Sequence, residues 1–320
     1  PGASRPRTPA GYFGNEEAGL RRTGVTATII DGRAIARRLQ AEAAAEAARL
    51  AAEGWAPRLV SLSVGDVAAA ELYVRNQRRQ AESAGLAFEA RDYPANISLE
   101  QLTGILHGLN ADPRVNGIII QRPLPAHIPV KELQRAIHPL KDVEGMHPAS
   151  IGNIVYNDLA LGPCTAVAAV EILKSLPLKI EGLDVTVIGH SEIVGKPIAF
   201  LMMGLGATVT VCHHMTRQVA VHSRRADAVF VAVGRPGLVT GEMLKPGAAL
   251  IDIGINRIET AEGPRTVGDA DFDSCAEVAG WITPVPGGVG PVTVAVQLQN
   301  AALATRMQMA QYRDAYAVAN

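Results

Sequence analysis

The segment from residue 184 to 197 has the residue types that a nucleotide-binding turn needs. It reads DVTVIGHSEIVGKP, which is an apolar strand, a turn with Gly189 and Gly195, and the start of a helix. Glycines let a backbone approach a ligand closely, Ser191 can cap the helix, and the amides at the helix N-terminus can bind a pyrophosphate. Ser191 stands where the strict GxGxxG fingerprint has its second glycine, so an ordinary strand–helix turn is the alternative.

The next apolar strand ends without an acidic residue. In NAD enzymes an acidic side chain near this strand end usually accepts hydrogen bonds from the ribose hydroxyls. Here the sequence has Cys212, His213 and His214, with Arg217 close behind. These groups suit a 2′-phosphate, so we expect NADP, with NAD as the alternative. The histidines could instead simply lie on the surface. A metal site is not expected, because adjacent strand residues point to opposite faces.

Alternating strands and helices would bring these groups together. Strand and helix patterns follow one another along the chain. Helices are predicted over 33–53, 68–84, 98–109, 131–137, 166–176 and 293–309. Strands are predicted over 58–64, 88–93, 115–121, 185–189, 208–213, 228–233 and 249–255. Residues 98–101 have the capping-box pattern. This order predicts an α/β fold with right-handed βαβ units and mostly parallel sheets.

Composition limits the classes of protein that fit. The 320 residues carry a net charge of -1, so no overall field would attract nucleic acid or an acidic membrane. The length favours two domains. The cysteines lack CxxC spacing, which favours a reducing, cytoplasmic compartment. No apolar run approaches the roughly 18–20 residues that span a bilayer. Residues 1–25 are expected to be a flexible extension and not a secretory signal.

A set of short motifs follows in a fixed order along the chain. The motifs are IDG at 30–32, YV at 73–74, QRPLP at 121–125, KDVEG at 141–145, PCT at 163–165, GHSEIVGKP at 189–197, VGRPG at 233–237, IDIGINR at 251–257, VGD at 267–269 and ITPVPGGVGP at 282–291. The ordered set, spanning about residues 29–303, resembles the bifunctional methylenetetrahydrofolate dehydrogenase/methenyltetrahydrofolate cyclohydrolase family.

The resemblance implies an N-terminal α/β folate domain over 26–167 and 291–320, and a Rossmann-type NAD(P)-binding domain over 168–290. It also implies a homodimer, with folate in the cleft between the domains. The implied folate-binding residues are Tyr73, Gln121, Glu144, Pro286, Gly287 and Gly288, the last three with a structural loop as the alternative. The implied cofactor-binding residues are Gly189, His190, Ser191, Ile193, Val194, Gly195, His214, Arg217, Val233, Gly234 and Ile255.

The folate pocket departs from the family pattern at the lysine of Tyr-Val-x-x-Lys. The sequence reads YVRNQ at 73–77, so this position is Gln77. Residues i and i+4 share a helix face, so Tyr73 and Gln77 should both point into the pocket. The resemblance assigns the lysine to proton transfer in the cyclohydrolase step, and an amide cannot titrate. The implied catalytic set is Tyr73, Gln77, Gln121 and Glu144.

Two more positions of the pocket differ from the family. AAA at 68–70 replaces Pro-Ala-Ser, which removes a hydroxyl, and Glu144 replaces the aspartate that contacts the pterin. Glutamate keeps the carboxylate but carries it one methylene further out. The pterin should therefore sit shifted, or the pocket should be wider. Neutral drift is the alternative explanation for Glu144.

The function expected from this reading is NADP-dependent oxidation of 5,10-methylenetetrahydrofolate to the methenyl form. Hydride transfer requires positioning of substrate and cofactor but no protein proton carrier. Hydrolysis of the methenyl product is expected to be lost or weak. One alternative is a methylenetetrahydrofolate-dependent transferase acting on a non-folate nucleophile, and another is an idle binder. The expected partner is the small-molecule folate, with no nucleic acid and no membrane.

Overall fold

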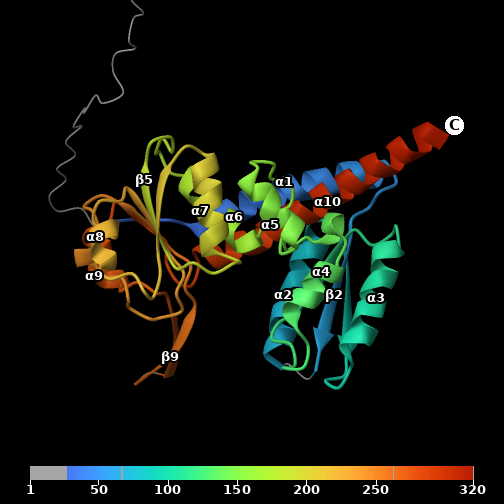
Figure 1. The fold of residues 1–320 in the computed structure, drawn as a ribbon, viewed down its shortest axis with the longest axis horizontal. Helices are drawn as coiled ribbons and strands as arrows, with labels where there is room; N and C mark the ends of the chain where they lie inside the picture. Colours follow the sequence, from blue (N-terminus) through green and yellow to red (C-terminus); the bar gives the residue numbers. More distant parts are fainter. Residues whose placement is uncertain (1–26, 66–67, 262, 320) are drawn as a thin grey trace, which may run out of the picture.

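The structure is a computed structural model in which two α/β lobes are joined by two long helices (Figure 1). It describes residues 27–65, 68–261 and 263–319, without the side chains of 68–73, 316, 318 and 319. The flexible extension predicted at 1–25 lies outside the described residues. No helix in the described parts of the chain is long and apolar enough to cross a membrane.

One lobe is built on a parallel three-stranded sheet of order β3-β2-β4. The central strand β2 and the edge strand β4 are almost entirely buried, as expected of strands covered on both faces, whereas the other edge strand, β3, is mostly half-buried. The capping box predicted at 98–101 is confirmed, because Ser98 and Gln101 bond reciprocally. The elements are β2 (Arg58–Val64), α2 (Ala68–Ser83), β3 (Ala87–Tyr93), α3 (Leu99–Ala111), β4 (Gly117–Ile120), α4 (Val130–Ala136), η1 (Pro139–Lys141) and α5 (Pro148–Val155).

The other lobe is built on a six-stranded sheet of order β1-β11-β8-β7-β5-β6, in which all neighbours are parallel. An antiparallel pair, β9 with β10, stands outside this sheet. The elements are β1 (Thr28–Ile29), α6 (Cys164–Lys174), β5 (Asp184–Ile188), α7 (Gly195–Gly204), β6 (Thr208–Cys212), α8 (Val219–Ser223), β7 (Ala228–Val231), η2 (Gly241–Met243), β8 (Ala249–Asp252), β9 (Asn256–Thr260), β10 (Gly263–Val267), α9 (Phe272–Ala276) and β11 (Trp281–Ile282).

Two helices hold the lobes together. Helix α1 (Gly32–Ala52) and helix α10 (Val289–Ala319) pack along one another, and α10 also packs against α6 (Figure 1). Buried alanines such as Ala43, Ala47, Ala301 and Ala304 lie in the shared core, where small side chains permit close helix packing. Helix α10 therefore carries its middle turns between the two lobes.

The predicted fold class is confirmed: the chain is a two-lobed α/β protein with parallel sheets. Several short elements, among them β1, α5 and the β9–β10 pair, have no counterpart in the predicted set. Strand β1 pairs with β11 in the six-stranded sheet, although the predicted folate domain begins at residue 26. A two-residue strand has too few side chains for a periodic pattern, which is why the sequence did not indicate it.

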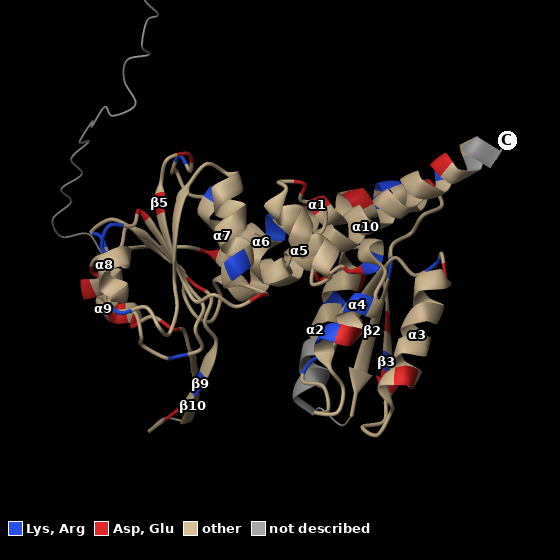
Figure 2. Cartoon of the chain, in the orientation of Figure 1, with Lys and Arg blue, Asp and Glu red and all other residues tan. Residues whose placement is uncertain are grey.

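Charged side chains of both signs are spread over both lobes (Figure 2). The chain carries 30 Lys and Arg against 31 Asp and Glu, and neither sign gathers on one lobe in this view. Local arrangements of charge, rather than an overall field, must therefore recognise any charged ligand.

Candidate active site

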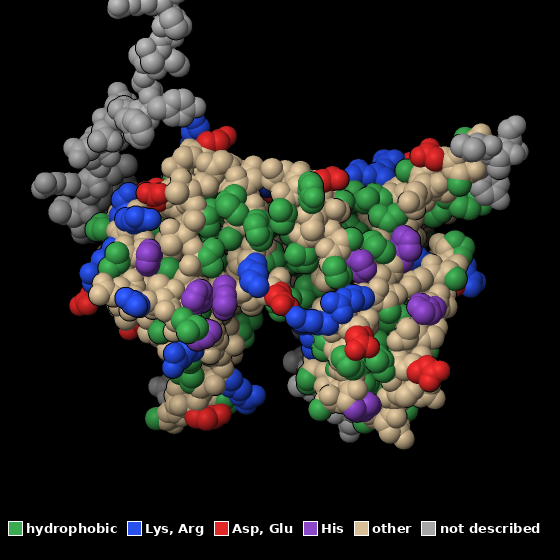
Figure 3. All heavy atoms as spheres, in the orientation of Figure 1, with side chains coloured by type: hydrophobic (Ala, Val, Ile, Leu, Met, Phe, Trp, Pro, Cys, Tyr) green, Lys and Arg blue, Asp and Glu red, His purple; other side chains and the backbone are tan. Residues whose placement is uncertain are grey.

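A cavity of about 250 Å³ lies between the two lobes. The end of β4, the turn after β5 and one face of α10 all contribute to its wall. A gap between the lobes is open in the space-filling view (Figure 3). The lining residues are Ile120, Gln121, Arg122, Glu144, Met146, Pro163, Cys164, Thr165, Ile193, Thr293 and Gln297. The structure thus brings the predicted residues Gln121 and Glu144 into one cavity.

Glu144 places an ionisable carboxyl group on this wall. One carboxylate oxygen accepts a hydrogen bond from the backbone N–H of Ile120 at 3.2 Å. Burial raises the pKa of Glu144 to about 7; the Ile120 bond opposes the rise, nearby Asp142 adds to it, and Arg122 opposes it. Near neutral pH the group can therefore accept hydrogen bonds as a carboxylate or donate one as an acid.

Gln77 lies behind the wall of the cavity. Its side chain is only 3% exposed. Its Oε1 accepts from Gln121 Nε2 at 2.7 Å, and its Nε2 donates to Gln297 Oε1 at 3.0 Å. Gln121 Nε2 also donates to Ser61 Oγ at 2.9 Å. We call Gln121, Gln77 and Gln297 the glutamine chain.

Gln77 itself does not line the cavity, since its amide is covered by two pocket-lining amides, and a direct contact between Gln77 and folate stays a prediction. The physical reason is that an amide both donates and accepts, so it links two flanking glutamines, which an ammonium group that only donates would not do in this way. The glutamine chain has one direction: each amide nitrogen donates to the next amide oxygen. Its last member, Gln297, keeps its NH₂ group at the cavity wall.

Other predicted folate residues lie elsewhere or outside the description. Tyr73 belongs to α2, but its side chain and those of residues 68–70 are outside the described set. Pro286, Gly287 and Gly288 do not line the cavity. Their loop packs on the start of α1, where a Cβ on Gly32 would lie 1.9 Å from the Gly288 carbonyl oxygen. A folate contact from this loop stays a prediction.

The contribution of α10 to the wall of the smaller cavity was not predicted from the sequence. Thr293, Gln297 and Asn300 are polar residues at i, i+4 and i+7 in a mostly apolar stretch of that helix. Thr293 and Gln297 line the cavity, while Asn300 Nδ2 donates to the Val143 and Gly162 carbonyls at 3.0 Å each. A polar stripe with helical spacing was the signal that could have identified this wall.

A second cavity, of about 810 Å³, lies at the carboxyl ends of β5, β6 and β7. Ligands of open parallel sheets bind at this edge. The lining residues are Ile188, Gly189, His190, Ser191, Glu192, Ile193, Lys196, His213, His214, Thr216, Val219, Ala232, Val233, Arg235 and Leu238. Most of the predicted cofactor turn is therefore brought together on one wall.

The turn after β5 is built as the sequence predicts. Gly189 has a φ of 116°, which favours glycine. A Cβ on Gly195 would lie 1.9 Å from the Gly189 carbonyl oxygen, so only glycine lets α7 start this close to the turn. Ser191 is not the N-cap residue, which is Val194, but its Oγ accepts from the Val194 N–H at 3.2 Å and so supports the turn just before the helix. The first turn of α7 thereby adjoins the second cavity.

Asp269 shapes the opposite wall of this cavity. Its fully buried carboxylate accepts from the backbone N–H groups of Val233, Gly234 and Arg235 at 2.6, 3.0 and 2.8 Å. Charge-assisted bonds of this kind hold a loop firmly. Among the predicted residues, Val194, Gly195, Gly234, Arg217 and Ile255 do not line the cavity, and Ile255 is 71% exposed.

Three histidines gather at the end of β6. The ring of His190 lies 4.7 Å from that of His213 and 6.0 Å from that of His214, between centroids. Cys212, by contrast, is fully buried. Within residues 27–65, 68–261 and 263–319 no group of His, Cys, Asp and Glu could hold a metal ion. In Figure 3 histidine side chains cluster on this lobe beside the gap.

The two cavities meet at Ile193, which lines both. Beside it, Glu192 forms an ion pair with Lys131 of α4 at 2.7 Å, so the cofactor turn is tied directly to the three-stranded lobe. A substrate in the smaller cavity and a dinucleotide in the larger one would therefore adjoin at one side chain. Such placement is what transfer between two bound molecules requires.

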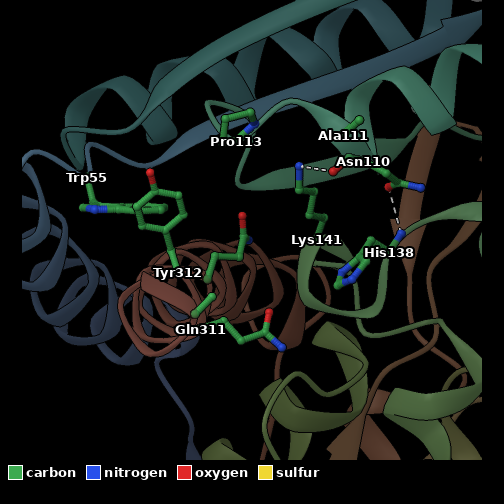
Figure 4. Close-up of a pocket in the computed structure, with 10 residues that line it drawn as sticks. Trp55, Asn110, Ala111, Pro113, His138, Lys141, Gln311 and Tyr312 are labelled. Carbon is green, nitrogen blue, oxygen red and sulfur yellow. Dashed lines mark hydrogen bonds between the residues drawn. The ribbon is translucent and has the colours of Figure 1, made fainter. Parts of the chain in front are cut away.

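A third cavity, of about 450 Å³, lies beside the C-terminal part of α10 and is lined by Trp55, Tyr312 and Lys141, among others (Figure 4). Lys141 Nζ donates to the carbonyls of Leu109, Asn110 and Asp112 at 2.7–2.8 Å, which caps the end of α3. Its three donors are thus used within the fold. This cavity carries no group that the chemistry of the other two requires.

Comparison with known proteins agrees with this geometry. Residues 30–144 match the model of the tetrahydrofolate dehydrogenase/cyclohydrolase catalytic domain, and residues 163–309 match the NAD(P)-binding domain of the same family. Bifunctional protein FolD 2 of Mesorhizobium japonicum is 61% identical over 91% of this chain and 95% of its own length. Bifunctional protein FolD of Rhodobacter capsulatus is 60% identical over 88% and 94%.

A solved structure agrees as well. The methylenetetrahydrofolate dehydrogenase-cyclohydrolase of Trypanosoma brucei, complexed with NADP and an inhibitor, superposes with a TM-score of 0.83 at 37% identity, covering 89% of this chain and 99% of that one. Both domain models, the close relatives and the superposition point to one assignment. The chain belongs to the tetrahydrofolate dehydrogenase/cyclohydrolase family.

Proposed function

We propose that this protein oxidises 5,10-methylenetetrahydrofolate to 5,10-methenyltetrahydrofolate with NADP, and that its cyclohydrolase activity is lost or very weak. The observation that carries the oxidation is the meeting of the two cavities at Ile193. The smaller cavity offers Gln121 and Glu144 to the polar edge of a pterin. The larger has the size and position of a dinucleotide site.

The residues of the larger cavity fit NADP. The close approach of Gly195 to Gly189 leaves room for a pyrophosphate at the start of α7, and histidines stand where NAD enzymes place an acid. Glu192, the carboxylate on this wall, is paired with Lys131. NADP, when bound, supplies the hydride acceptor. The protein holds the folate beside it and excludes water, which is how positioning accelerates such a transfer.

The glutamine chain supports the proposed loss of hydrolysis. Hydrolysis of the methenyl group needs a proton to be taken from water and delivered to a leaving nitrogen, and general acid–base help is worth about 100–10,000-fold. The Gln77 amide cannot titrate, and its oxygen and nitrogen are each engaged by a neighbouring glutamine. The relatives from Mesorhizobium japonicum and Rhodobacter capsulatus carry the name bifunctional, so this restriction is a proposal about this chain alone.

Among the described side chains that line the cavity, Glu144 is the carboxyl group from which residual hydrolysis could arise. Its pKa, raised to about 7 by burial, is suited to general acid–base work. A Glu144→Gln variant shows whether any residual hydrolysis depends on this carboxyl group. If weak hydrolysis persists in the wild type and disappears in this variant, Glu144 carries the proton.

The test is to mix the protein with methylenetetrahydrofolate and NADP and follow the absorbance of the reduced cofactor and of the methenyl product. Equal rises, with the methenyl signal decaying no faster than in buffer, are expected. Folate binding without reduced cofactor would favour the alternative, one-carbon transfer to a non-folate nucleophile. This proposal includes the domain limits at 167/168 and 290/291, the folate and cofactor contacts, and the homodimer. Analytical sedimentation tests whether the protein is a dimer.

A further inference from the structure

The three histidines of the cofactor cavity form one electrostatic unit. His190 comes from the turn after β5, and His213 and His214 follow β6. All three line the 810 Å³ cavity, with ring centroids 4.7–6.0 Å apart. Their position at the end of β6 is where the adenosine ribose of a dinucleotide lies in this kind of sheet.

Few other charges face this unit. In the described part of the chain, the other charged side chains that line the cavity are Lys196 of α7, Arg235 after β7, and Glu192. The carboxylate of Glu192 is engaged by Lys131 at 2.7 Å. The surroundings of the histidines are thus neutral to positive, which suits an anion and opposes the accumulation of imidazolium charge before an anion arrives.

The charge state of the histidines depends on that anion. Burial lowers the pKa of His190, and the neighbouring His213, Lys196 and His214 lower it further. Like charges at these separations repel one another, which opposes protonation of His190 in the ligand-free protein. A phosphate dianion placed among the rings reverses the balance and favours the charged form.

We propose that His190, His213 and His214 together recognise the 2′-phosphate of NADP and that His190 takes up a proton as the phosphate binds, so that the preference for NADP over NAD falls as pH rises. The inference rests on the proposed function and adds a determinant of cofactor choice to it. A phosphate monoester has its second ionisation near about pH 6, so above about pH 7 the ligand is already a dianion. Any proton taken up there goes to the protein.

Proton uptake sets the size of the effect. Each proton bound with the ligand makes the dissociation constant rise about tenfold per pH unit above the titration range. With one proton per NADP, affinity should fall by about one to two orders of magnitude between about pH 6.5 and pH 8.5. NAD has no 2′-phosphate, so its dissociation constant should change little over the same range.

The experiment is titration calorimetry of the whole protein with NADP and with NAD at about pH 7.5, in two buffers of different ionisation enthalpy. Close to one proton taken up with NADP, and close to none with NAD, is expected. A His190→Arg variant carries a permanent charge, so it should bind NADP with less uptake and a flatter pH profile. His214→Gln, at an exposed position, should weaken NADP and not NAD. His107→Gln on the exposed face of α3 is the matched control.

Equal uptake with both cofactors, no uptake with NADP, or an unchanged pH profile in His190→Arg would overturn the inference, because fixed charges such as Arg235 would then carry the phosphate. These results leave the proposed function intact as long as NADP supports folate oxidation. Absence of NADP-dependent oxidation at every pH would instead count against the function itself.

Discussion

Restoring a lysine at position 77 is the perturbation that probes the glutamine chain most sharply. In a Gln77→Lys variant the ammonium would replace an amide that is 3% exposed and bonded to Gln121 and Gln297. Burial disfavours the charged form and moves a lysine pKa toward neutrality. A titratable donor would then stand one side chain behind the cavity wall.

The magnitude follows from the contacts. The variant loses the Gln77 Oε1 acceptor, which leaves a Gln121 N–H without this partner, at a cost of about 1–3 kcal/mol in the free energy of unfolding. In return, general acid–base help should raise the rate of methenyltetrahydrofolate hydrolysis by about 100-fold or more. The oxidation rate should change far less, because it needs no protein proton carrier.

The assay follows the loss of methenyl absorbance, corrected for the spontaneous rate, together with a thermal melt. Gln77→Met is the control: it has similar length, loses both hydrogen bonds of the Gln77 amide and cannot titrate. It should be destabilised at least as much as the lysine variant without gaining hydrolysis. A folded lysine variant that oxidises folate normally and hydrolyses no faster than the wild type would refute the reasoning about this position.

Three further predictions concern the walls of the two cavities. Gly195→Ala should lower the free energy of unfolding by about 1–3 kcal/mol and weaken NADP binding, because its Cβ would lie 1.9 Å from the Gly189 oxygen. Gly104→Ala in α3 is the control, because a Cβ at this position would meet no atom within 4 Å. It should raise the free energy of unfolding by about 0.5–1 kcal/mol in a chemical melt. Asp269→Asn should cost about 3 kcal/mol and raise the KM for NADP, since the loop amides it binds lose a charged acceptor. Glu144 has a folded-state pKa of about 7, raised from 4.5, so its contribution to stability is present at low pH and is lost as pH rises toward 7; up to about 3 kcal/mol of that pH dependence should vanish in Glu144→Gln. Denaturant melts of both proteins between about pH 5 and pH 8 measure it, and parallel curves would contradict the assignment.

The cofactor side of the molecule could be predicted from the sequence because its signals are local. The turn after β5 combines a strand end, two glycines and a helix start within a few residues, and these occupy their predicted places, although the N-cap residue is Val194 and not Ser191. The histidine pair after β6 could be singled out because it stands where NAD enzymes usually have an acidic residue. The clustering of His190 with that pair depends on how β5 and β6 pair in register, which no local pattern contains.

The contacts behind the smaller cavity could not be predicted from the sequence, because they join segments that are far apart along the chain. Gln77 and Gln297 are 220 positions apart, so nothing near Gln77 indicates that its amide is engaged. The Pro-Gly-Gly loop has the composition of a ligand wall, yet its carbonyls pack on Gly32 at the start of α1. Composition shows that glycine lets something approach closely, and only the fold shows whether that neighbour is a ligand or the chain itself.

The proposed loss of cyclohydrolase activity is tested most directly by the wild-type rate of 5,10-methenyltetrahydrofolate hydrolysis. The rate is measured against protein concentration, in a preparation already shown to oxidise methylenetetrahydrofolate. With an amide buried at position 77, we expect the rate to stay at the spontaneous value as protein is added. A rate that climbs in proportion to protein and is comparable to the oxidation rate would show that another group moves the proton, and the amide at position 77 would then not prevent hydrolysis.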